Sequence, residues 1–425
     1  MALPQAKADA TEARLATLSL PTNATEARQA ALGRVSAMGL PNKRDEYWKY
    51  TDPATLVEPD APEAALFHND EGPLFADLDR VKVIFKDGVF DPEASDNLAA
   101  QGLEIELLSD ALSSDIHWAK DMYGTLEARG QLPVQRPLAA LNTAFADAGV
   151  VIRATETVQK PINLIYLHED VSSDAMLHIL VKVDPGAEVT VLETGPAAAR
   201  FSKVMEVDVG EGATFHHVRA QGRDHERRAV THCFASVAAK STFKSFTMTF
   251  NGVLTRNECV IEITGDDATA HVAGACVGDG KDFHHDDTVF ITHDAVNCES
   301  RQVFKKVLRN GATGVFQGKI LVKEGAQKTD GYQISQSLLL DDDSQFLAKP
   351  ELEIYADDVA CSHGSTSGAI DEEALFYLQS RGVPLMEATD LLTLAFLAEA
   401  LEEIENEALS DDLRNRLESW LARHR

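Results

Sequence analysis

The feature that most constrains the fold is a long central region of β-strand patterns with no helical pattern between them. From about residue 149 to about residue 340, apolar and polar residues alternate with a period of two, as they do in strands. The clearest segments are residues 177–183, 188–192, 204–209 and 242–250. Many short strands without intervening helices leave three architectures open: a β-sandwich, a β-barrel or a β-solenoid.

Glycine–alanine pairs recur through this region, usually just before another short apolar strand. The glycines of these pairs are Gly186, Gly212, Gly274, Gly311 and Gly325. We read the pairs as turns that punctuate the strands. Their spacing is irregular, so the sequence contains no strict hexapeptide repeat. Periodicity alone therefore does not choose among the three architectures.

Helical patterns flank the strand region on both sides. The first forty residues are rich in alanine, and Asn23 and Glu26 have the spacing of a capping box for a helix that Gly39 and Pro41 end. A mixed region follows to about residue 150. We therefore expect an N-terminal helical and mixed domain (1–150), a β-structured core (151–368) and a C-terminal helical domain (369–425).

The C-terminal region predicts three helices. Asp371 is placed to cap the first, which ends at Gly382, and Pro384 opens the second. Ser410 or Asp411 is expected to start the third. Five residues of the second helix form a broad apolar face: Ala388, Leu391, Leu392, Ala395 and Phe396. Such faces either pack on one another or leave a groove for a partner protein.

Composition and charge exclude several classes of protein. The chain has 425 residues, of which 44% are hydrophobic and 25% charged, close to the averages of globular proteins. Its formal net charge of −29 repels phosphate backbones and anionic lipid surfaces, so we expect neither nucleic acid nor a membrane as partner. The longest apolar stretch, residues 391–398, is far shorter than the roughly 20 residues that span a bilayer.

The cellular compartment is predicted from the N-terminus and the cysteines. The first seven residues contain no basic segment followed by an apolar core, so we expect no secretory signal. The five cysteines (Cys233, Cys259, Cys276, Cys298 and Cys361) include no CxxC pair, which favours free thiols in a reducing compartment. The expected location is the cytoplasm. The first four cysteines lie in strand-like stretches and are read as buried small hydrophobes.

The chain lacks the best-marked catalytic motifs. It contains no P-loop, no dinucleotide-binding fingerprint, no HExxH and no GxSxG. Nucleotide hydrolysis, hydride transfer and the common hydrolase mechanisms therefore lack their sequence signatures. For a chain of this length, the absence shifts the prediction from an enzyme towards a scaffold or binding protein.

Two groups of histidines invite a metal-site reading. One is His216 with His217, and the other is His284 with His285, followed by His293. Neighbouring side chains on a strand point to opposite faces, so adjacent histidines do not ligate one ion without a bulge or turn. Hydrogen-bonded polar ladders are the better interpretation of both groups.

Cys361 and His363 form a different kind of pair. Side chains two residues apart in an extended segment project to the same side, so this thiol and imidazole can share one metal or sulfur atom. A thiolate is the soft ligand that iron in a cluster requires, and an adjacent imidazolium would lower the thiol pKa. An iron–sulfur cluster usually takes four protein ligands, so two residues predict a half-site that a partner or carrier completes.

Several motifs resemble the SufB/SufD family of iron–sulfur cluster assembly scaffolds. They are residues 349–364 (KPELEIYADDVACSHG) with 371–378 and 380–382, the N-terminal residues 44–51 (RDEYWKYT), and the core segments 316–320, 326–330 and 337–340. Within the family, the match is to the SufD branch, because SufB carries extra N-terminal cysteines and a different sequence at residues 358–364. Together the motifs cover nearly the whole chain.

The resemblance implies a right-handed parallel β-helix core, flanked by N-terminal and C-terminal helical domains. It implies a heterodimer with SufB through the β-helices, and a SufC ATPase docked on the C-terminal helical domain. The docking residues by this reading are Phe376, Tyr377, Arg381, Leu391, Leu392 and Phe396.

The resemblance implies that the position matching Cys361 lies at the interface with SufB, and that the position matching His363 takes part in assembling the nascent cluster there. By this reading Cys361 and His363 are metal ligands shared with a partner chain. The resemblance also implies a role in iron acquisition. ATP hydrolysis belongs to SufC, so the chain is not expected to be an enzyme. A homodimer of the isolated chain, and a reduced flavin at the level of the complex, are further possibilities that the family carries.

Two rival functions stay open at this stage. A β-helical carbohydrate-active enzyme would share the strand pattern, although no acidic and basic grouping suggests a sugar site. A self-sufficient metalloenzyme would rest on His284 and His285.

Overall fold

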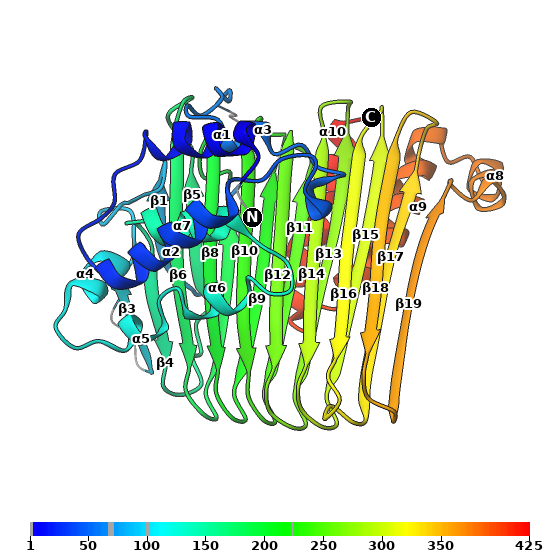
Figure 1. Ribbon diagram of the computed structural model, residues 1–425. Coiled ribbons are helices and arrows are strands. Elements are labelled where there is room, and N and C mark those ends of the chain that lie inside the picture. Colours follow the sequence, from blue (N-terminus) through cyan, green and yellow to red (C-terminus); the bar gives the residue numbers. More distant parts are fainter. Residues whose placement is uncertain (1–2, 67–71, 99–101, 223) are drawn as a thin grey trace.

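The computed structural model describes residues 3–66, 72–98, 102–222 and 224–425, and its centre is a parallel β-helix (Figure 1). Successive strands alternate between two sheets, so each coil of the chain adds one strand to each sheet. Sheet A contains β5 (Ile162–Leu167), β7 (Glu188–Thr194), β9 (Thr214–Gly222), β11 (Thr242–Phe250), β13 (Thr269–Asp279), β15 (Glu299–Arg309), β17 (Thr329–Leu339) and β19 (Val359–Gly368). Sheet B contains β4 (Val150–Ala154), β6 (Asp174–Val183), β8 (Arg200–Val209), β10 (Arg228–Val237), β12 (Leu254–Ile263), β14 (His284–His293), β16 (Thr313–Val322) and β18 (Gln345–Ile354). The predicted β-helix is therefore confirmed.

The coils are held in register by ladders between equivalent positions. Every strand listed above pairs in parallel with the strand one coil away, and hydrogen-bonded side chains such as Asn257 and Asp287 are 30 residues apart. A coil length that varies around this value explains why no short fixed repeat is visible in the sequence. The interior between the sheets holds one continuous apolar cluster that includes Leu164, Ile179 and Val207.

Four of the five glycine–alanine pairs mark turns, as predicted. Gly186, Gly212 and Gly311 have φ values of 75°, 65° and 84°, a backbone region that glycine enters without steric cost. The fifth pair was misread, because Gly274 lies inside β13. A β-carbon there would come within 2.9 Å of the Phe304 ring, so this glycine makes room for an aromatic side chain on the next strand.

The N-terminal region covers the outer face of sheet B. It contains α1 (Gln5–Leu15), α2 (Thr25–Met38), η1 (Glu46–Trp48), α3 (Ala54–Val57), α4 (Leu108–Ser113), α5 (Trp118–Met122), α6 (Thr125–Arg129) and α7 (Pro137–Phe145). It also contains three strands that extend the sheets: β1 (Val81–Lys86) and β2 (Val89–Phe90) in sheet A, and β3 (Leu103–Leu107), antiparallel to β4, in sheet B. Helices α2 and α7 pack on each other and against apolar residues of sheet B such as Val230.

The predicted capping box at Asn23 is wrong. Helix α2 begins after Ala24, which has a left-handed backbone, and no side chain caps it. The Asn23 side chain instead accepts hydrogen bonds from Arg28, whose guanidinium also donates to the backbone carbonyls of Thr143 and Ala144. The Asn23 side chain, which local spacing assigned to the start of the helix, therefore binds the buried Arg28 that joins α2 to α7.

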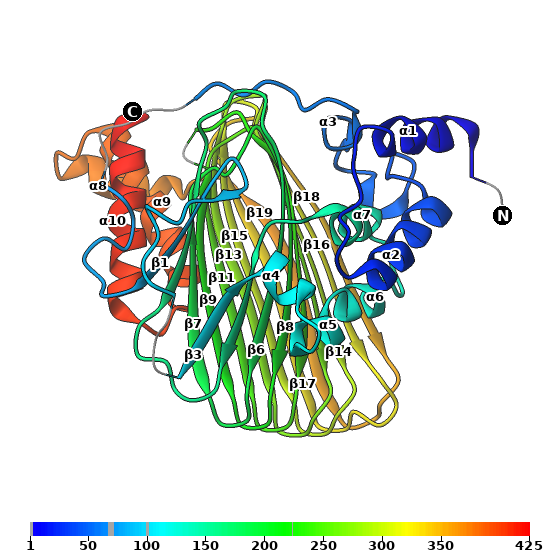
Figure 2. The same cartoon turned by 90° about the vertical axis from the view of Figure 1, so that its left-hand side faces the viewer.

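The C-terminal helices cover the outer face of sheet A, on the side opposite to the N-terminal helices (Figure 2). They are α8 (Glu372–Ser380), α9 (Leu385–Leu401) and α10 (Glu407–Arg423). Asp371 caps α8 as predicted, by accepting from the backbone N–H groups of Glu373 and Ala374. The last helix starts earlier than predicted, since Asn406 and not Ser410 or Asp411 supplies its cap. Among the described residues, no helix is long and apolar enough to cross a membrane.

Helices α9 and α10 are fixed to sheet A by an apolar core and by ion pairs around it. Leu397, Leu413 and Trp420 are buried against strand residues such as Phe246 and Met248. Lys244 pairs with Glu405, and Lys305 pairs with Glu399. Helix α8 is different, because none of its residues is buried and it projects beyond the end of the strands (Figure 1).

Candidate functional site

Cys361 and His363 lie on β19, the outermost strand of sheet A. Cys361 is opposite Gly331 of β17, and His363 is opposite Gln333. Further along the same strand, Ser365 hydrogen-bonds to Ser335 at 3.0 Å, which marks the face that these alternate residues share. Cys361 and His363 are two residues apart on an extended strand, so their side chains project to the same side, as the spacing predicted.

The Cys361 thiol sits at the edge of a small apolar cluster. This cluster contains Ile320, Val322 and Ala326, and Cys361 is partly buried against it. Burial raises the pKa of the Cys361 thiol, and its contact with the backbone N–H of Gly331 offsets this only in part. His363 is not among the groups that shift this pKa, so the lowering expected from a neighbouring imidazolium stays a prediction.

The His363 side chain is exposed, whereas the residue opposite it on β17 is fully buried. That residue, Gln333, donates a hydrogen bond of 2.8 Å to Gln302 one coil further in. Gly318 of the facing sheet leaves the space that the Gln333 amide fills, since a β-carbon there would lie 2.4 Å from the amide nitrogen. The imidazole thus stands at the end of a stack of interior polar side chains.

The end of the β-helix that carries this site is open. Strand β18 is the last strand of sheet B and β19 is the last strand of sheet A. Neither has a neighbouring strand on its outer side among the described residues. Residues of β18 are largely half-buried and those of β19 largely exposed, while the interior strands are mostly buried. Unpaired N–H and C=O groups on two adjacent edges form a template for another polypeptide.

Among the described residues, Cys361 and His363 have no third metal-ligating side chain beside them. In the part of the chain that the structure describes, no group of three or more histidine, cysteine, aspartate or glutamate side chains is arranged around a common point for a metal ion. Cys361 and His363 therefore stay a two-ligand arrangement at an open edge.

The histidine clusters have other roles. His284 and His285 point to opposite sides of β14, as predicted: His284 contacts Thr51 of the N-terminal region at 2.9 Å, and His285 contacts Thr249 inside the β-helix at 3.0 Å. His293 contacts Ser300 at 2.8 Å in the interior. Burial lowers the pKa of His285 to about 3 and that of His293 to about 4, so both are neutral at pH 7.

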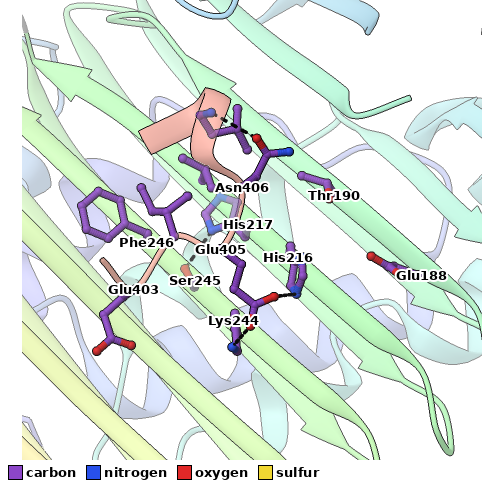
Figure 3. A pocket seen from close by; sticks show the side chains of 13 residues that line it. Glu188, Thr190, His216, His217, Lys244, Ser245, Phe246, Glu403, Glu405 and Asn406 are labelled. Carbon is purple, nitrogen blue, oxygen red and sulfur yellow. Dashed lines mark hydrogen bonds and ion pairs between the residues drawn. The ribbon is translucent and has the colours of Figure 1, made fainter. Parts of the chain in front are cut away.

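His216 and His217 also separate to opposite faces. His216 faces Glu405 of the turn between α9 and α10. The ring nitrogens of His217 hydrogen-bond to Ser245 and to Glu193 in the interior of the β-helix. A cavity of about 260 Å³ lies beside them, between sheet A and that turn (Figure 3). Sequence patterns did not indicate this cavity, because it brings together strands and a turn that are about 190 residues apart in the chain.

The four remaining cysteines are free thiols. Cys259, Cys276 and Cys298 are buried, as predicted, and Cys233 is partly buried. Burial raises the pKa of Cys276 to about 12, so this residue is an inert thiol at pH 7. Cys233 and Cys259 lie directly opposite each other on β10 and β12.

Of the residues expected to dock a partner, the apolar side chains of Phe376, Tyr377 and Leu391 are exposed on α8 and α9. Phe376 is 72% exposed, Tyr377 54% and Leu391 45%, and Arg381 stacks on the Tyr377 ring at 3.6 Å. Leu392 and Phe396 are half-buried. Phe396 packs towards the β-helix, where the Lys305 ammonium lies 4.6 Å from its ring centre.

Comparisons with known proteins agree with this architecture. Residues 166–396 match the family described as SUF system FeS cluster assembly, SufBD core domain, and residues 11–164 match the SufBD protein N-terminal region. The chain is 28% identical to the iron–sulfur cluster assembly protein SufD of Escherichia coli, over 92% of this chain and 91% of that protein. It is 26% identical to an iron–sulfur cluster assembly SufBD family protein of Synechocystis, over 91% and 89% of the two chains. It is 27% identical to SufD of Bacillus subtilis, over 66% and 65%.

The fold and site define a β-helical protein with an open, polar-lined end and helices on both outer faces. The family match covers more than half of the chain, and it confirms the resemblance found in the motifs. This chain belongs to the SufBD family of SUF-system iron–sulfur cluster assembly proteins, and it is SufD-like by similarity.

Proposed function

We propose that this chain is the scaffold subunit that pairs with a SufB homologue through its open β-helix end and holds a nascent iron–sulfur cluster there. The observation that carries the proposal is the position of Cys361 and His363 on the outermost strand, on one face and beside the open edge. The similarity to SufD proteins supports the same assignment.

The open end supports a partner made of the same kind of coil. Both β18 and β19 expose an unpaired edge, and a second β-helix offers two matching edges. Exposed strand edges of this length promote aggregation of an isolated protein. A dedicated partner that pairs with both edges would prevent this. A homodimer of the isolated chain through the same edges is the natural default when the partner is absent.

The chemistry of the site favours assembly that the partner controls. The Cys361 thiol is protonated in the isolated chain, since burial raises its pKa. Binding of iron releases this proton, because the thiolate is the metal ligand. Two ligands from this chain leave the other coordination positions to sulfide and to the partner, so a cluster forms only where both subunits meet.

The exposed surface of α8 and α9 supports docking of the SufC ATPase on residues 369–425. Phe376 and Tyr377 are large apolar side chains on a helix with no buried residue. Aromatic and arginine side chains are enriched at the energetic centres of protein interfaces, and Arg381 stacks on Tyr377 here.

The proposed cycle couples ATP to the open end. SufC closure on ATP pulls the two C-terminal helical domains, opens the interface between the β-helices, and exposes Cys361 and His363 to iron and sulfide. Helices α9 and α10 are packed on sheet A through Leu397 and Leu413, so a pull on them is transmitted to the strands. ATP hydrolysis is assigned to SufC in this proposal, and this chain takes part in iron acquisition through the site. We assign none of its described residues to a flavin.

The test is isolation of the chain from its native cell together with complementation. We expect an ABC-type ATPase and a longer homologue to co-purify with it. Cys361→Ser and His363→Ala are expected to keep these partners and to lose support of cluster-dependent growth. Normal growth with both variants would refute the site, and recovery of the chain without either partner would refute the scaffold role.

A further inference from the structure

The interior of the β-helix contains more buried cations than buried anions. Four cationic side chains face it among the described residues (Lys203, Arg219, Arg227 and Lys306), against two carboxylates (Glu193 and Asp287), and all six are at least 90% buried. Lys203 pairs with Glu193, and Lys306 pairs with Asp287. Among the described residues, neither arginine forms an ion pair with a carboxylate, although the charge of Glu193 acts on both.

The contacts of these arginines are to neutral groups. Arg219 donates to Thr231 and to Asn257, each at 2.8 Å. Arg227 donates to the carbonyl of Pro196 at 2.9 Å and to Gln221 at 3.0 Å. The Nε atoms of both arginines are buried and have no hydrogen-bond acceptor. Isolated buried charges are costly, and unsatisfied donors add to that cost.

Two small cavities lie on either side of Arg219. One has about 40 Å³ and is lined by Lys203, Cys233 and Cys259 as well as by Arg219. The other has about 10 Å³ and lies between Arg219 and Arg227. A cavity needs roughly 10–15 Å³ by this measure to hold one water-sized guest, so the larger one has room for a small ion.

We propose that the β-helix binds a small monovalent anion, of the size of chloride or hydrosulfide, in the cavity beside Arg219. The guanidinium of Arg219 supplies the charge, next to the ammonium of Lys203, which also pairs with Glu193. Ser245, Thr247, Asn257 and the two thiols are among the other lining groups. Two carboxylates also line the cavity, and each has a cationic partner: Asp287 pairs with Lys306, and Glu258 pairs with Arg256. This anion site lies inside the β-helix and is formed by this chain alone. The proposal therefore does not rest on the proposed role of Cys361 and His363.

The electrostatics of the neighbours agree with an anion and oppose a cation. Burial, and next the charge of Arg219, lower the pKa of Arg227 to about 9 against the opposing charge of Glu193, so the Arg227 guanidinium remains charged at pH 7. The Cys233 thiol hydrogen-bonds to Cys259 and, together with burial, raises the Cys259 pKa well above the ordinary thiol range. The Cys259 thiol is therefore neutral at pH 7, and a thiol S–H is a weak donor to an anion.

The test begins with the intact chain and three sodium salts at equal ionic strength: chloride, bromide and gluconate, the last too large for the cavity. A ligand that binds only the folded chain stabilises it in proportion to the logarithm of its concentration. We expect the Tm in chloride and in bromide to exceed that in gluconate by about 2 °C or more. Crystals grown in bromide are expected to give an anomalous peak beside Arg219.

Two variants and a sulfide arm complete the experiment. In Arg219→Gln, the Tm difference between chloride and gluconate is expected to disappear, while Arg301→Gln, a half-exposed arginine on the outer face of β15, keeps it. Anaerobic dialysis against sodium hydrosulfide, followed by a bound-sulfide assay, separates the sources. Retained sulfide that Arg219→Gln loses identifies hydrosulfide as the anion, and no retained sulfide together with a bromide peak identifies chloride. No bromide peak with equal Tm values in all three salts would overturn the proposal, as would an Arg219→Gln variant that responds like the wild type.

Discussion

The Cys361 thiol lies 3.2 Å from the position that a β-carbon on Gly331 would occupy. The two residues are directly opposite each other on β19 and β17, so the absence of a side chain on one strand creates the space for the thiol on the other. Ile320 approaches the same position at 3.5 Å and limits how far the neighbours can yield. The site at the open end thus depends on a residue that contributes no ligand.

Gly331→Ala is expected to displace the Cys361 thiol by a few tenths of an ångström, away from the apolar side chains that partly bury it. The rate at which iodoacetamide labels Cys361 should rise roughly three-fold or more, because the thiol becomes more accessible and its pKa falls towards the ordinary value. Labelling followed by peptide mass spectrometry measures this rate. Gly364→Ala on the same strand is the matched control, since its β-carbon would meet only Ile334, at 4.0 Å. Equal labelling of both variants and the wild type would contradict the role given to Gly331.

The exposed aromatic residues of α8 are expected to act in binding and not in folding. Phe376→Asp with Tyr377→Asp should weaken association with the ATPase partner at least ten-fold, because buried aromatic anchors commonly carry 2 kcal/mol or more. The Tm of the isolated chain should change little, since α8 contains no buried residue. Ile116→Asp, at a position 95% exposed near α5, is the control. Association with the partner, measured by calorimetry, should survive in the control, and its survival in the α8 variant would refute the docking surface.

His293 is expected to contribute to acid sensitivity. Its pKa is about 4 in the folded chain, because of burial, against about 6.5 in the unfolded chain. The unfolded state then binds the extra proton as pH falls below about 6.5, so the free energy of unfolding decreases and the loss is complete near pH 4. Between pH 7 and pH 5.5 this one residue accounts for about 1 kcal/mol. Urea unfolding of His293→Gln should show a pH dependence smaller by that amount, and an unchanged dependence would contradict the assignment.

Arg136 is expected to be essential for the N-terminal region to dock on sheet B. It is 2% exposed and donates to Glu258 at 2.8 Å, and its guanidinium lies 4.8 Å from the centre of the Phe290 ring. Despite opposing burial, Arg256 and Arg136 lower the pKa of Glu258 to about 2. Removal of Arg136 leaves the buried Glu258 with only one of its two arginine partners, Arg256, so Arg136→Met should cost up to about 3 kcal/mol. The double variant Arg136→Met with Glu258→Gln is expected to recover part of that loss in urea unfolding, and a double variant less stable than the single one would contradict this pairing.

The sequence predicted the elements of this chain better than their arrangement. The strand at residues 242–250 and the cap at Asp371 were readable, because period-two alternation and capping are local properties. The choice of a β-helix needed the family motifs, since coil lengths vary and no local pattern encodes which strand pairs with which. Gly274 shows the limit well: its role is to admit Phe304, which is thirty residues away.

The sequence was enough to predict the pair of residues in the candidate site, but not the surroundings of that pair in the fold. Spacing alone brought Cys361 and His363 to one face, but the open edge, the glycine that admits the thiol and the buried Gln333 are set by neighbouring coils. The same holds for Thr51 and Asp286, which hydrogen-bond at 2.5 Å across 235 residues. The buried arginines of the interior were also beyond sequence patterns, because an unpaired charge is recognised only when all its neighbours are known.

The most direct test of the central claim is the iron and sulfide content of the complete complex after anaerobic assembly. The complex would be purified with wild-type chain, with Cys361→Ser and with His363→Ala, and its subunit composition compared by gel filtration. The account predicts complexes of the same composition, in which the two variants hold at least five-fold less cluster than the wild type. Variants that assemble the full complex and load iron and sulfide at the wild-type level would contradict it.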